Sequence, residues 1–387
     1  MGTMRRRTVA SRRACGDDRR HAMRELRTLW SRFRQGRARR FRLATIQGTA
    51  MIDLRSDTVT RPSQAMLAAM TAAEVGDDVW GDDPTVLRLQ AVTAERAGKE
   101  AGLFFPSGTQ SNLAALMAHC ERGDEYIVGQ LAHTYKYEGG GAAVLGSIQP
   151  QPIENAPDGT LPIAKIAAAI KPIDNHFART RLLALENTIG GQVLPEGYVQ
   201  EAVAFARSRG LSAHLDGARV CNAAVASGRT IAELSAPFDT VSICFSKGLG
   251  APVGSVLVGS RALIERAQRW RKVLGGGMRQ SGILAAACLY ALDHNVERLA
   301  DDHANAARLA EGLARIEPVK VLSHATNMVF AQFPEADCAP LEAWLKARGI
   351  LTQMLYASRF VTHCDVSRAD VDTFVDAVGA YFAQRRA

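Results

Sequence analysis

The sequence predicts an α/β protein, with a large domain built on a mostly parallel sheet and a smaller C-terminal α/β domain. Short apolar runs alternate with stretches of helical periodicity, which is the order that strands joined by crossover helices produce. The 387 residues are enough for one large core and one smaller core. A hydrophobic content of 47% and a charged content of 22% are typical of a soluble globular chain.

The individual elements follow from local spacing. Segment 53–63 is polar and loop-like, and Pro62 and Ser63 mark the start of a helix. Apolar spacing predicts amphipathic helices at 65–70 and 86–97. Strands are predicted at 101–105, 125–128, 181–185, 211–215, 240–245 and 253–258. A helical pattern from about 281 to 316 precedes a second α/β stretch, with runs at 318–322, 327–333 and 358–362, a helix near 340–348 and a last helix from about 367. We therefore expect a large domain, with its N-terminal segment, over 51–300 and a small domain over 301–387.

The first fifty residues differ from the rest of the chain in charge. They hold fifteen arginines and three acidic residues, a net charge of +12, so the other 337 residues carry −4 of the total of +8. A basic arm for nucleic acid is one interpretation and a transit peptide is another. A secretory signal is excluded because no apolar stretch follows the arginines. We favour a third interpretation, in which Met51 is the working start and residues 1–50 are disordered or mis-assigned. No nucleic-acid partner is then expected.

The cysteines and the hydropathy of the chain indicate the cellular compartment in which we expect the protein. The seven cysteines are scattered without CxxC pairs, which favours reduced thiols in the cytoplasm and argues against a metal site. No apolar run reaches the roughly 18–20 residues of a membrane helix, and the longest, 283–292, is predicted to be a core helix. We expect a cytoplasmic protein without a membrane segment or a metal.

Three motifs with possible chemistry lie where predicted strands end, which is where open α/β sheets place their ligands. In 104–116 a strand turns into a helix through Ser107, Gly108 and Thr109, and a helix N-terminus favours an anion such as phosphate. Asp216 ends a second strand. Lys247 follows a third strand among small residues, where desolvation and neighbouring cations could activate it as a nucleophile. Taken singly, the three motifs could equally be a capped helix, a capping acid and a solvated lysine.

Taken together, the three motifs are what pyridoxal phosphate requires. The helix start would bind the phosphate, the carboxylate would keep the pyridine nitrogen protonated, and the lysine would hold the aldehyde as a Schiff base. A protonated ring accepts the electrons of a bond broken at the α-carbon of an amino acid. The sequence therefore predicts a pyridoxal 5'-phosphate site around Lys247.

From residue 51 onward the chain resembles the β-eliminating lyase and low-specificity L-threonine aldolase family, whose members are pyridoxal-phosphate enzymes of fold type I with an aspartate aminotransferase-like large domain. The resemblance covers essentially all of 51–387 and none of 1–50. The stretches that carry it are MIDLRSDTVTRPS, GDDVWGDDPTV, PSGTQSNL, GDEYIVGQLAH, LENTIGGQVLP, HLDGAR, SKGLGAPVGS and RWRKVLGGGMRQSG.

The resemblance implies roles for the cofactor site. Lys247 would form the internal aldimine, Asp216 would pair with the pyridine nitrogen, and His133 would stack on the ring. Arg219 would bond the ring hydroxyl or the substrate. The phosphate would be bound by Gly108, Thr109 and Ser246 of one chain, and by Lys272 and Arg279 across a subunit interface.

Further residues are assigned to the substrate. Arg359 and Ser56 would hold its carboxylate, a task that suits a forked guanidinium. His176 would shape the pocket near the β-hydroxyl. An aromatic residue, Tyr137, stands where an apolar one is expected, which affects the predicted preference at the β-carbon.

The implied activity is retro-aldol cleavage of L-threonine or L-allo-threonine to glycine and acetaldehyde. His133, His176 or an ordered water could take the β-hydroxyl proton. β-Elimination, transamination and decarboxylation on the same scaffold are the rival chemistries. The cations around 275–277 have no obvious partner within one chain, so we expect them to cross an interface. The expected assembly is a dimer with shared sites, and a homotetramer overall.

Overall fold

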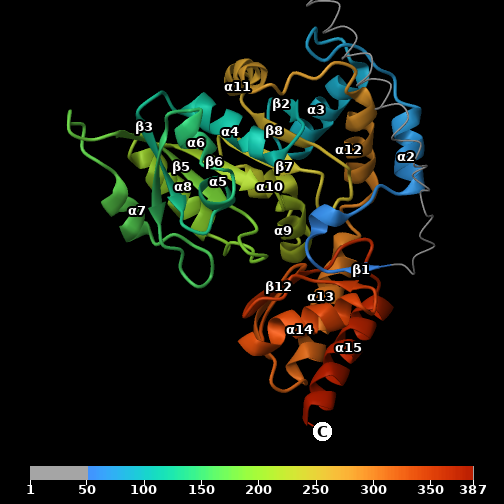
Figure 1. Cartoon of the computed structure of the whole chain (residues 1–387). Helices are drawn as coiled ribbons and strands as arrows, with labels where there is room; N and C mark the ends of the chain where they lie inside the picture. Colours follow the sequence, from blue (N-terminus) through green and yellow to red (C-terminus); the bar gives the residue numbers. More distant parts are fainter. Residues whose placement is uncertain (1–50, 387) are drawn as a thin grey trace, which may run out of the picture. The chain divides into compact units, whose positions relative to one another are not determined.

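The computed structural model describes residues 51–386, and the expectation for residues 1–50 lies outside that range. The largest sheet has seven strands in the order β2-β8-β7-β6-β5-β3-β4 (Figure 1). The pairs from β7 to β4 are parallel, whereas β8 runs antiparallel to both β2 and β7. The predicted α/β class with a mostly parallel sheet is confirmed. The strands are β2 (Ala101–Phe105), β3 (Asp124–Gly129), β4 (Gln149–Ile153), β5 (Arg179–Glu186), β6 (Ser212–Gly217), β7 (Thr240–Cys244) and β8 (Ser255–Gly259).

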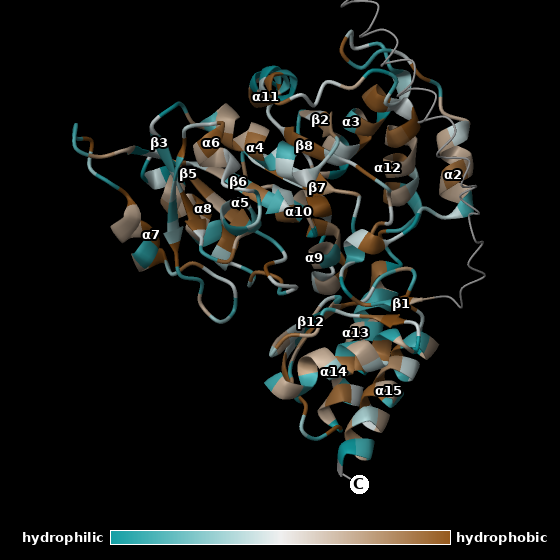
Figure 2. Cartoon of the chain, in the orientation of Figure 1, coloured by the Kyte–Doolittle hydropathy of each residue, from teal (hydrophilic) through white to brown (hydrophobic). Residues whose placement is uncertain are grey.

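Helices connect these strands and enclose the sheet because its inner strands are apolar on both faces. All five residues of β7 and all five of β8 are buried. Figure 2 shows α12 as largely hydrophobic and α11 as largely hydrophilic, and accordingly eight residues of α12 are buried against three of α11. The helices up to this point are η1 (Asp57–Val59), α2 (Gln64–Thr71), α3 (Pro84–Arg96), α4 (Gly108–His119), α5 (His133–Lys136), α6 (Gly141–Val144), α7 (Ile163–Ala169), α8 (Tyr198–Ser208), α9 (Val220–Ser227), α10 (Ile231–Ser235), α11 (Arg261–Val273) and α12 (Gly282–His294).

A second core forms from the C-terminal elements. Its three-stranded sheet has the order β12-β10-β9 and is antiparallel throughout. Ile52 and Leu54 from the start of the described chain belong to this core, and β1 (Ile52–Asp53) pairs in parallel with β11 (Ile350–Leu351). Figure 1 shows β1, in blue, among these orange and red elements. The remaining elements are α13 (Leu299–Ala314), β9 (Lys320–Ala325), β10 (Met328–Gln332), α14 (Glu335–Lys346), β12 (Ala357–Val361) and α15 (Arg368–Arg386). The domain boundary near residue 300 stays a prediction.

The predicted helical stretch 281–316 is two helices. α12 ends at His294 and α13 begins at Leu299. Asn295 caps the first helix and Arg298 precedes the second, so the break turns both side chains toward the loop that follows β7. None of the helices within residues 51–386 is long and apolar enough to cross a membrane.

Candidate functional site

Four neighbouring parallel strands present polar side chains at their carboxyl ends. In sheet order, Lys247 follows β7, Asp216 lies near the end of β6, Glu186 ends β5 and His133 follows β3. Because the carboxyl ends of parallel strands share one edge, the topology alone brings the four residues together. The ligand-type atoms of His133, Glu138 and Asp216 lie within 4.8 Å of one another. The sheet therefore brings into one site residues that are up to 114 positions apart in the sequence, from His133 to Lys247.

Lys247 is partly buried and extends from a tight turn. The N–H of Gly250 donates to its carbonyl at 2.8 Å, and Gly250 has a left-handed φ of 78°. At Gly248 a Cβ atom would come within 2.9 Å of Leu299, so the small residues beside the lysine permit close packing against α13. Within the described residues no side chain or carbonyl binds the Nζ of Lys247. Its amine is therefore free to react.

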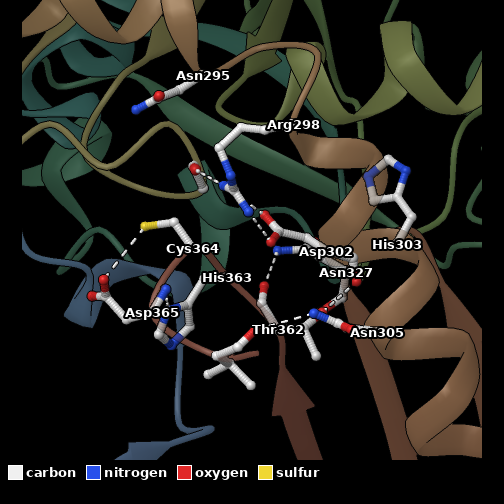
Figure 3. A network of polar contacts seen from close by, with 12 residues as sticks. Asn295, Arg298, Asp302, His303, Asn305, Asn327, Thr362, His363, Cys364 and Asp365 are labelled. Carbon is white, nitrogen blue, oxygen red and sulfur yellow. Dashed lines mark hydrogen bonds and ion pairs between the residues drawn. The ribbon is translucent and has the colours of Figure 1, made fainter. Parts of the chain in front are cut away.

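Three side chains hold the backbone of this turn, which we call the lysine loop (residues 246–250). Thr60 Oγ1 donates to the carbonyl of Lys247 at 3.2 Å, Arg298 to that of Gly248 at 3.3 Å, and Asn295 to that of Leu249 at 2.7 Å. Arg298 also pairs with buried Asp302, and Figure 3 shows the two side chains facing each other. The loop is thus fixed from the N-terminal segment and from both helices around the α12–α13 break.

The start of α4 has the features of an anion site. Ser107 caps the helix by accepting the N–H of Gln110 at 3.2 Å. The N–H groups of Gly108 and Thr109 find no acceptor among residues 51–386, as expected for the first turn of a helix. The buried hydroxyl of Ser255 also lacks a partner there, and a Cβ on Gly108 would lie 3.5 Å from it. The predicted phosphate residues Gly108 and Thr109 therefore present unpaired donors, and Ser246 lies in the lysine loop.

Asp216 is held by both of its carboxylate oxygens. Its Oδ2 accepts from Asn112 Nδ2 at 2.8 Å, and its Oδ1 accepts the N–H of Ala218 at 3.0 Å. The residue is 3% exposed, yet each oxygen keeps a second lone pair. A carboxylate placed in this way can accept a hydrogen bond from a protonated ring nitrogen.

His133 is tied to two carboxyl groups. Its Nδ1 lies 2.8 Å from Glu138 Oε1, and its main-chain N–H donates to Glu186 Oε2 at 2.7 Å. The hydrogen bond with Glu138 raises the pKa of His133 above its ordinary value. Burial, reinforced by the negative charge of Asp216, raises the pKa of Glu186 to about 8. The site thus contains a carboxyl group that keeps its proton near neutral pH in the cofactor-free chain.

Arg219 is fixed by Asp57 in a bidentate ion pair of 2.8 and 2.6 Å. Asn327, which directly precedes β10, donates to the same carboxylate at 3.2 Å. Burial alone would raise the pKa of Asp57, but the charge of Arg219 and these hydrogen bonds hold it at about 2. Arg219 is therefore a preoriented cation at the end of β6.

The two residues predicted to bind the substrate carboxylate lie near this pair. Ser56 caps η1, directly before Asp57. Arg359 lies on β12 and donates to the carbonyl of Arg55 at 3.4 Å. Burial and the neighbouring charge of Arg219 lower the pKa of Arg359. A negatively charged substrate group would relieve the repulsion between the two guanidinium groups.

Three predicted site residues lie apart from this cluster in the single chain. His176 is in the loop before β5, with 80% of its side chain exposed, and pairs with Asp174. Lys272 is exposed near the end of α11. Arg279 is exposed and pairs with Asp77 at 2.9 Å. The assignment of His176 to the substrate pocket stays a prediction, and that of Lys272 and Arg279 is a prediction that requires a second chain.

The expectation that the cations around 275–277 have no partner within one chain is wrong for Arg271 and for Arg279, which pairs with Asp77. Arg271 is buried, pairs with Asp78 at 2.9 Å and donates to the carbonyl of Phe104 at 2.8 Å. The glycines also serve this chain's own packing, because a Cβ on Gly276 would come within 1.9 Å of Gln110 at the start of α4.

Sequence reasoning missed four residues of the site: Asp57, Asn112, Glu138 and Glu186. Asp57, Asn112 and Glu186 lie inside stretches that carry the resemblance, whereas Glu138 lies outside them, and the partners of the four lie between 5 and 162 positions away. A polar residue at the end of a predicted strand was the one available signal, and it applied to Glu186.

The residues present fit pyridoxal phosphate. Unpaired N–H donors at the start of α4 suit its phosphate, the acceptor Asp216 suits its ring nitrogen, and the free amine of Lys247 suits its aldehyde. Each of these groups lacks an internal partner at the point where the cofactor would supply one.

Comparisons with known proteins agree with this chemistry. A family model described as "Beta-eliminating lyase" matches residues 53–336. The low specificity L-threonine aldolase of Escherichia coli (strain K12) is 61% identical over 318 residues, covering 82% of this chain and 95% of that protein. The probable low-specificity L-threonine aldolase 2 of Arabidopsis thaliana is 47% identical over 334 residues, covering 83% and 94%.

Solved structures resemble the fold at lower sequence identity. The threonine aldolase of Leishmania major superposes with a TM-score of 0.73 at 22% identity, covering 85% of this chain and 99% of that one. The serine palmitoyltransferase of Sphingomonas wittichii gives a TM-score of 0.69 at 18% identity, covering 86% and 88%. At these identities the likeness concerns the fold alone.

Proposed function

The chain belongs to the beta-eliminating lyase family, and we propose that the site at the carboxyl ends of β3, β5, β6 and β7 is its pyridoxal-phosphate centre. The protein is a lyase, a low-specificity L-threonine aldolase, and cleaves L-threonine and related β-hydroxy-α-amino acids to glycine and an aldehyde. The observation that supports the residue assignments is the convergence of unpaired N–H donors, a carboxylate acceptor and a free lysine amine at one sheet edge.

Each residue has a separate task. When bound, pyridoxal phosphate supplies an electron sink for the bond broken at the substrate's α-carbon. The Nζ of Lys247 attaches the cofactor, Asp216 keeps the ring nitrogen protonated, and the start of α4 binds the phosphate. Arg359 and Ser56 bind the substrate carboxylate, and Arg219 hydrogen-bonds the ring hydroxyl or the substrate.

His133 would stack on the ring of the bound cofactor, and we assign to it the removal of the β-hydroxyl proton. Its Nδ1 is held by Glu138, which leaves Nε2 for the substrate. His176 or a water molecule are the competing candidates for this step. A His133→Phe variant keeps an aromatic ring but has no proton acceptor, so a loss of turnover without a loss of cofactor supports His133.

Incubation of the purified protein with L-threonine and L-allo-threonine tests the activity. Acetaldehyde and glycine should form in equal amounts. Pyruvate or another keto acid would indicate elimination or transamination instead. The Lys247→Ala variant should reduce acetaldehyde formation by about three orders of magnitude or more. Retention of a tenth of the activity would refute the assignment of Lys247.

We further propose a dimer with shared sites, assembled into a tetramer, in the cytoplasm. Large apolar side chains are exposed in the described part of the chain, among them Trp80 at 80%, Tyr137 at 63%, and Val273, directly after Lys272, at 63%. Exposed apolar groups of this kind mark protein interfaces. In this assembly Lys272 and Arg279 reach a neighbouring cofactor phosphate.

The six described cysteines are unpaired, which suits a reducing compartment.

A further inference from the structure

A chain of buried polar side chains lies behind Asp216. Asn112 on α4 donates to Asp216 Oδ2 at 2.8 Å, and its Oδ1 lies 3.2 Å from His214 Nε2. His214 Nδ1 lies 2.9 Å from Thr240 Oγ1, which in turn lies 2.8 Å from His119 Nε2. Asn112 is 2% exposed, Thr240 and His214 are 0% exposed, and His119 is 7% exposed. None of these four residues is needed for the tasks assigned above.

The partners fix the direction of every hydrogen bond in this chain. Asn112 Nδ2 faces two acceptors, Asp216 and Glu138, so the amide nitrogen must point toward them and Oδ1 toward His214. His214 must then carry its proton on Nε2.

The directions of the two hydrogen bonds of Thr240, with His214 and with His119, follow from this tautomer. Burial lowers the pKa of His214 to about 3 and that of His119 to about 4, so both rings are neutral in the working range. A neutral ring protonated on Nε2 has a bare Nδ1, to which the Thr240 hydroxyl donates. Thr240 Oγ1 therefore accepts the Nε2–H of His119.

We propose that Asn112, His214 and Thr240 are positioning residues, which form one directional hydrogen-bond chain that orients the Asp216 carboxylate toward the cofactor's ring nitrogen. The proposal rests on the role of Asp216 in the proposed function. Without the Thr240 hydroxyl, His214 Nδ1 would lose its partner, and the ring would no longer be held in place to donate to Asn112 Oδ1. That oxygen would lose its buried donor, and Asn112 would shift away from Asp216.

Asn112 also connects Asp216 to His133. The second N–H of its amide donates to Glu138 at 3.0 Å, and Glu138 holds His133. One amide therefore sets the position of the acid below the ring nitrogen and, through Glu138, that of the histidine against the ring. The loss of its orientation should affect both contacts at once.

Thr240→Val tests the chain with an almost isosteric change that removes the hydroxyl, and Thr240→Ser is the matched control that retains it. Cofactor-free protein is titrated with pyridoxal phosphate and with an analogue that has carbon in place of the ring nitrogen. Wild type should prefer pyridoxal phosphate. We expect Thr240→Val to lose most of this preference, with roughly a tenfold fall in kcat and little change in KM, and Thr240→Ser to match wild type.

A second background keeps the test valid if Thr240→Val is poorly stable. In His214→Gln the amide Nε2 takes the place of the ring nitrogen as donor to Asn112, and there is no imidazole ring for Thr240 to hold in place. Adding Thr240→Val to His214→Gln should therefore cost much less activity than adding it to wild type. The proposal would be overturned if Thr240→Val reduced activity equally in wild type and in His214→Gln. It would also be overturned if Thr240→Val kept the wild-type preference for pyridoxal phosphate over the analogue.

Asp216→Asn separates this proposal from the proposed function. If Asp216→Asn abolishes the preference for the ring nitrogen and Thr240→Val does not, the chain is wrong and the role of Asp216 stands. If Asp216→Asn retains the preference, the ring-nitrogen assignment itself fails.

Discussion

Asp57 shows how one buried side chain serves both stability and the site. Its carboxylate holds Arg219 through two hydrogen bonds and accepts a third from Asn327. Replacement of one partner in a buried pair leaves the other charge uncompensated, so Asp57→Asn should lower the free energy of unfolding by roughly 3–5 kcal/mol. The solvent-accessible bidentate pair of Arg308 and Asp372 is the control, and Asp372→Asn should lower the free energy of unfolding far less than Asp57→Asn.

The pH dependence gives a second check on Asp57. The folded pKa of about 2 lies below the ordinary value of 3.8, so the stabilisation is complete above pH 4 and is lost as the pH falls toward 2. Urea unfolding from pH 6 downward should show the wild-type and Asp57→Asn stabilities converging in that window. A stability difference between wild type and Asp57→Asn that did not change with pH would contradict the ion pair.

Glu186 should make the opposite contribution. Burial and the charge of Asp216 raise its folded pKa from 4.5 to about 8, so the folded state binds this proton more tightly than the unfolded state. Stability of the cofactor-free chain should therefore fall as the pH rises from about 4.5 to 8. Glu186→Gln is neutral at every pH, so its stability should match that of wild type below the unfolded pKa of 4.5 and exceed it above pH 8. If the difference in the free energy of unfolding between Glu186→Gln and wild type were the same at low and high pH, a protonated Glu186 would be refuted.

At the scale of the element, the first turn of α4 combines a sterically permissive glycine with unpaired N–H groups. A Cβ on Gly108 would make only ordinary contacts, 3.5 Å to Ser255 Oγ and 3.9 Å to Cys244 Sγ. Packing within the chain therefore leaves room for a side chain at this position. In the proposed site, the phosphate of bound pyridoxal phosphate would occupy the space that this side chain would fill.

Gly108→Ala should therefore separate stability from cofactor binding. We expect the free energy of unfolding of the cofactor-free chain to stay constant or rise by up to about 1 kcal/mol, because alanine restricts the unfolded chain. Affinity for pyridoxal phosphate should fall by roughly tenfold or more, because the phosphate loses its close approach to the backbone. Gly379→Ala in α15, whose Cβ would lie 3.8 Å from Ile316, is the control that leaves affinity unchanged. Wild-type affinity in Gly108→Ala would move the phosphate site elsewhere.

Most elements could be predicted because local patterns determine them. Strands β2, β3, β5, β6, β7 and β8 begin and end within two residues of the predicted runs. β4 has the sequence QPQPI, and its two prolines remove the strand signal while still permitting a place at the edge of the sheet. The break between α12 and α13 was missed because apolar periodicity continues across it.

The site was predictable only in part, for a related reason. Lys247, Asp216 and Gly108 occur in local motifs whose chemistry can be recognised one at a time. The hydrogen bonds that fix them cross 104 positions between Asn112 and Asp216, and 187 between Thr60 and Lys247. No local spacing encodes those pairs, which exist because α4 packs against β6 and the N-terminal segment reaches the lysine loop.

At the scale of the whole molecule, the N-terminal segment links the two cores at the lysine loop. Ile52 and Leu54 pack in the C-terminal core, Asp57 binds Arg219 after β6, and Thr60 donates to Lys247. A cut in this segment should therefore affect catalysis and stability together.

The proposed assembly predicts that active sites can be restored by mixing chains. Lys247→Ala lacks the attachment amine and Arg279→Ala lacks the cation supplied to a neighbour. If each site uses both chains, a hybrid dimer contains one complete site, so the two inactive variants should recover some activity when co-expressed. The two variants expressed separately are the controls. Verified hybrids without activity, or an active monomer by light scattering, would refute shared sites.

Attachment of the cofactor to Lys247 is the central claim, and reduction with borohydride tests it most directly. The purified protein loaded with pyridoxal phosphate should absorb visible light and lose that absorption on reduction. Proteolysis and mass spectrometry should then find the cofactor bound covalently to the peptide that contains Lys247, and to no peptide of Lys247→Ala. Attachment to another lysine, or absorption that borohydride does not remove, would contradict the account.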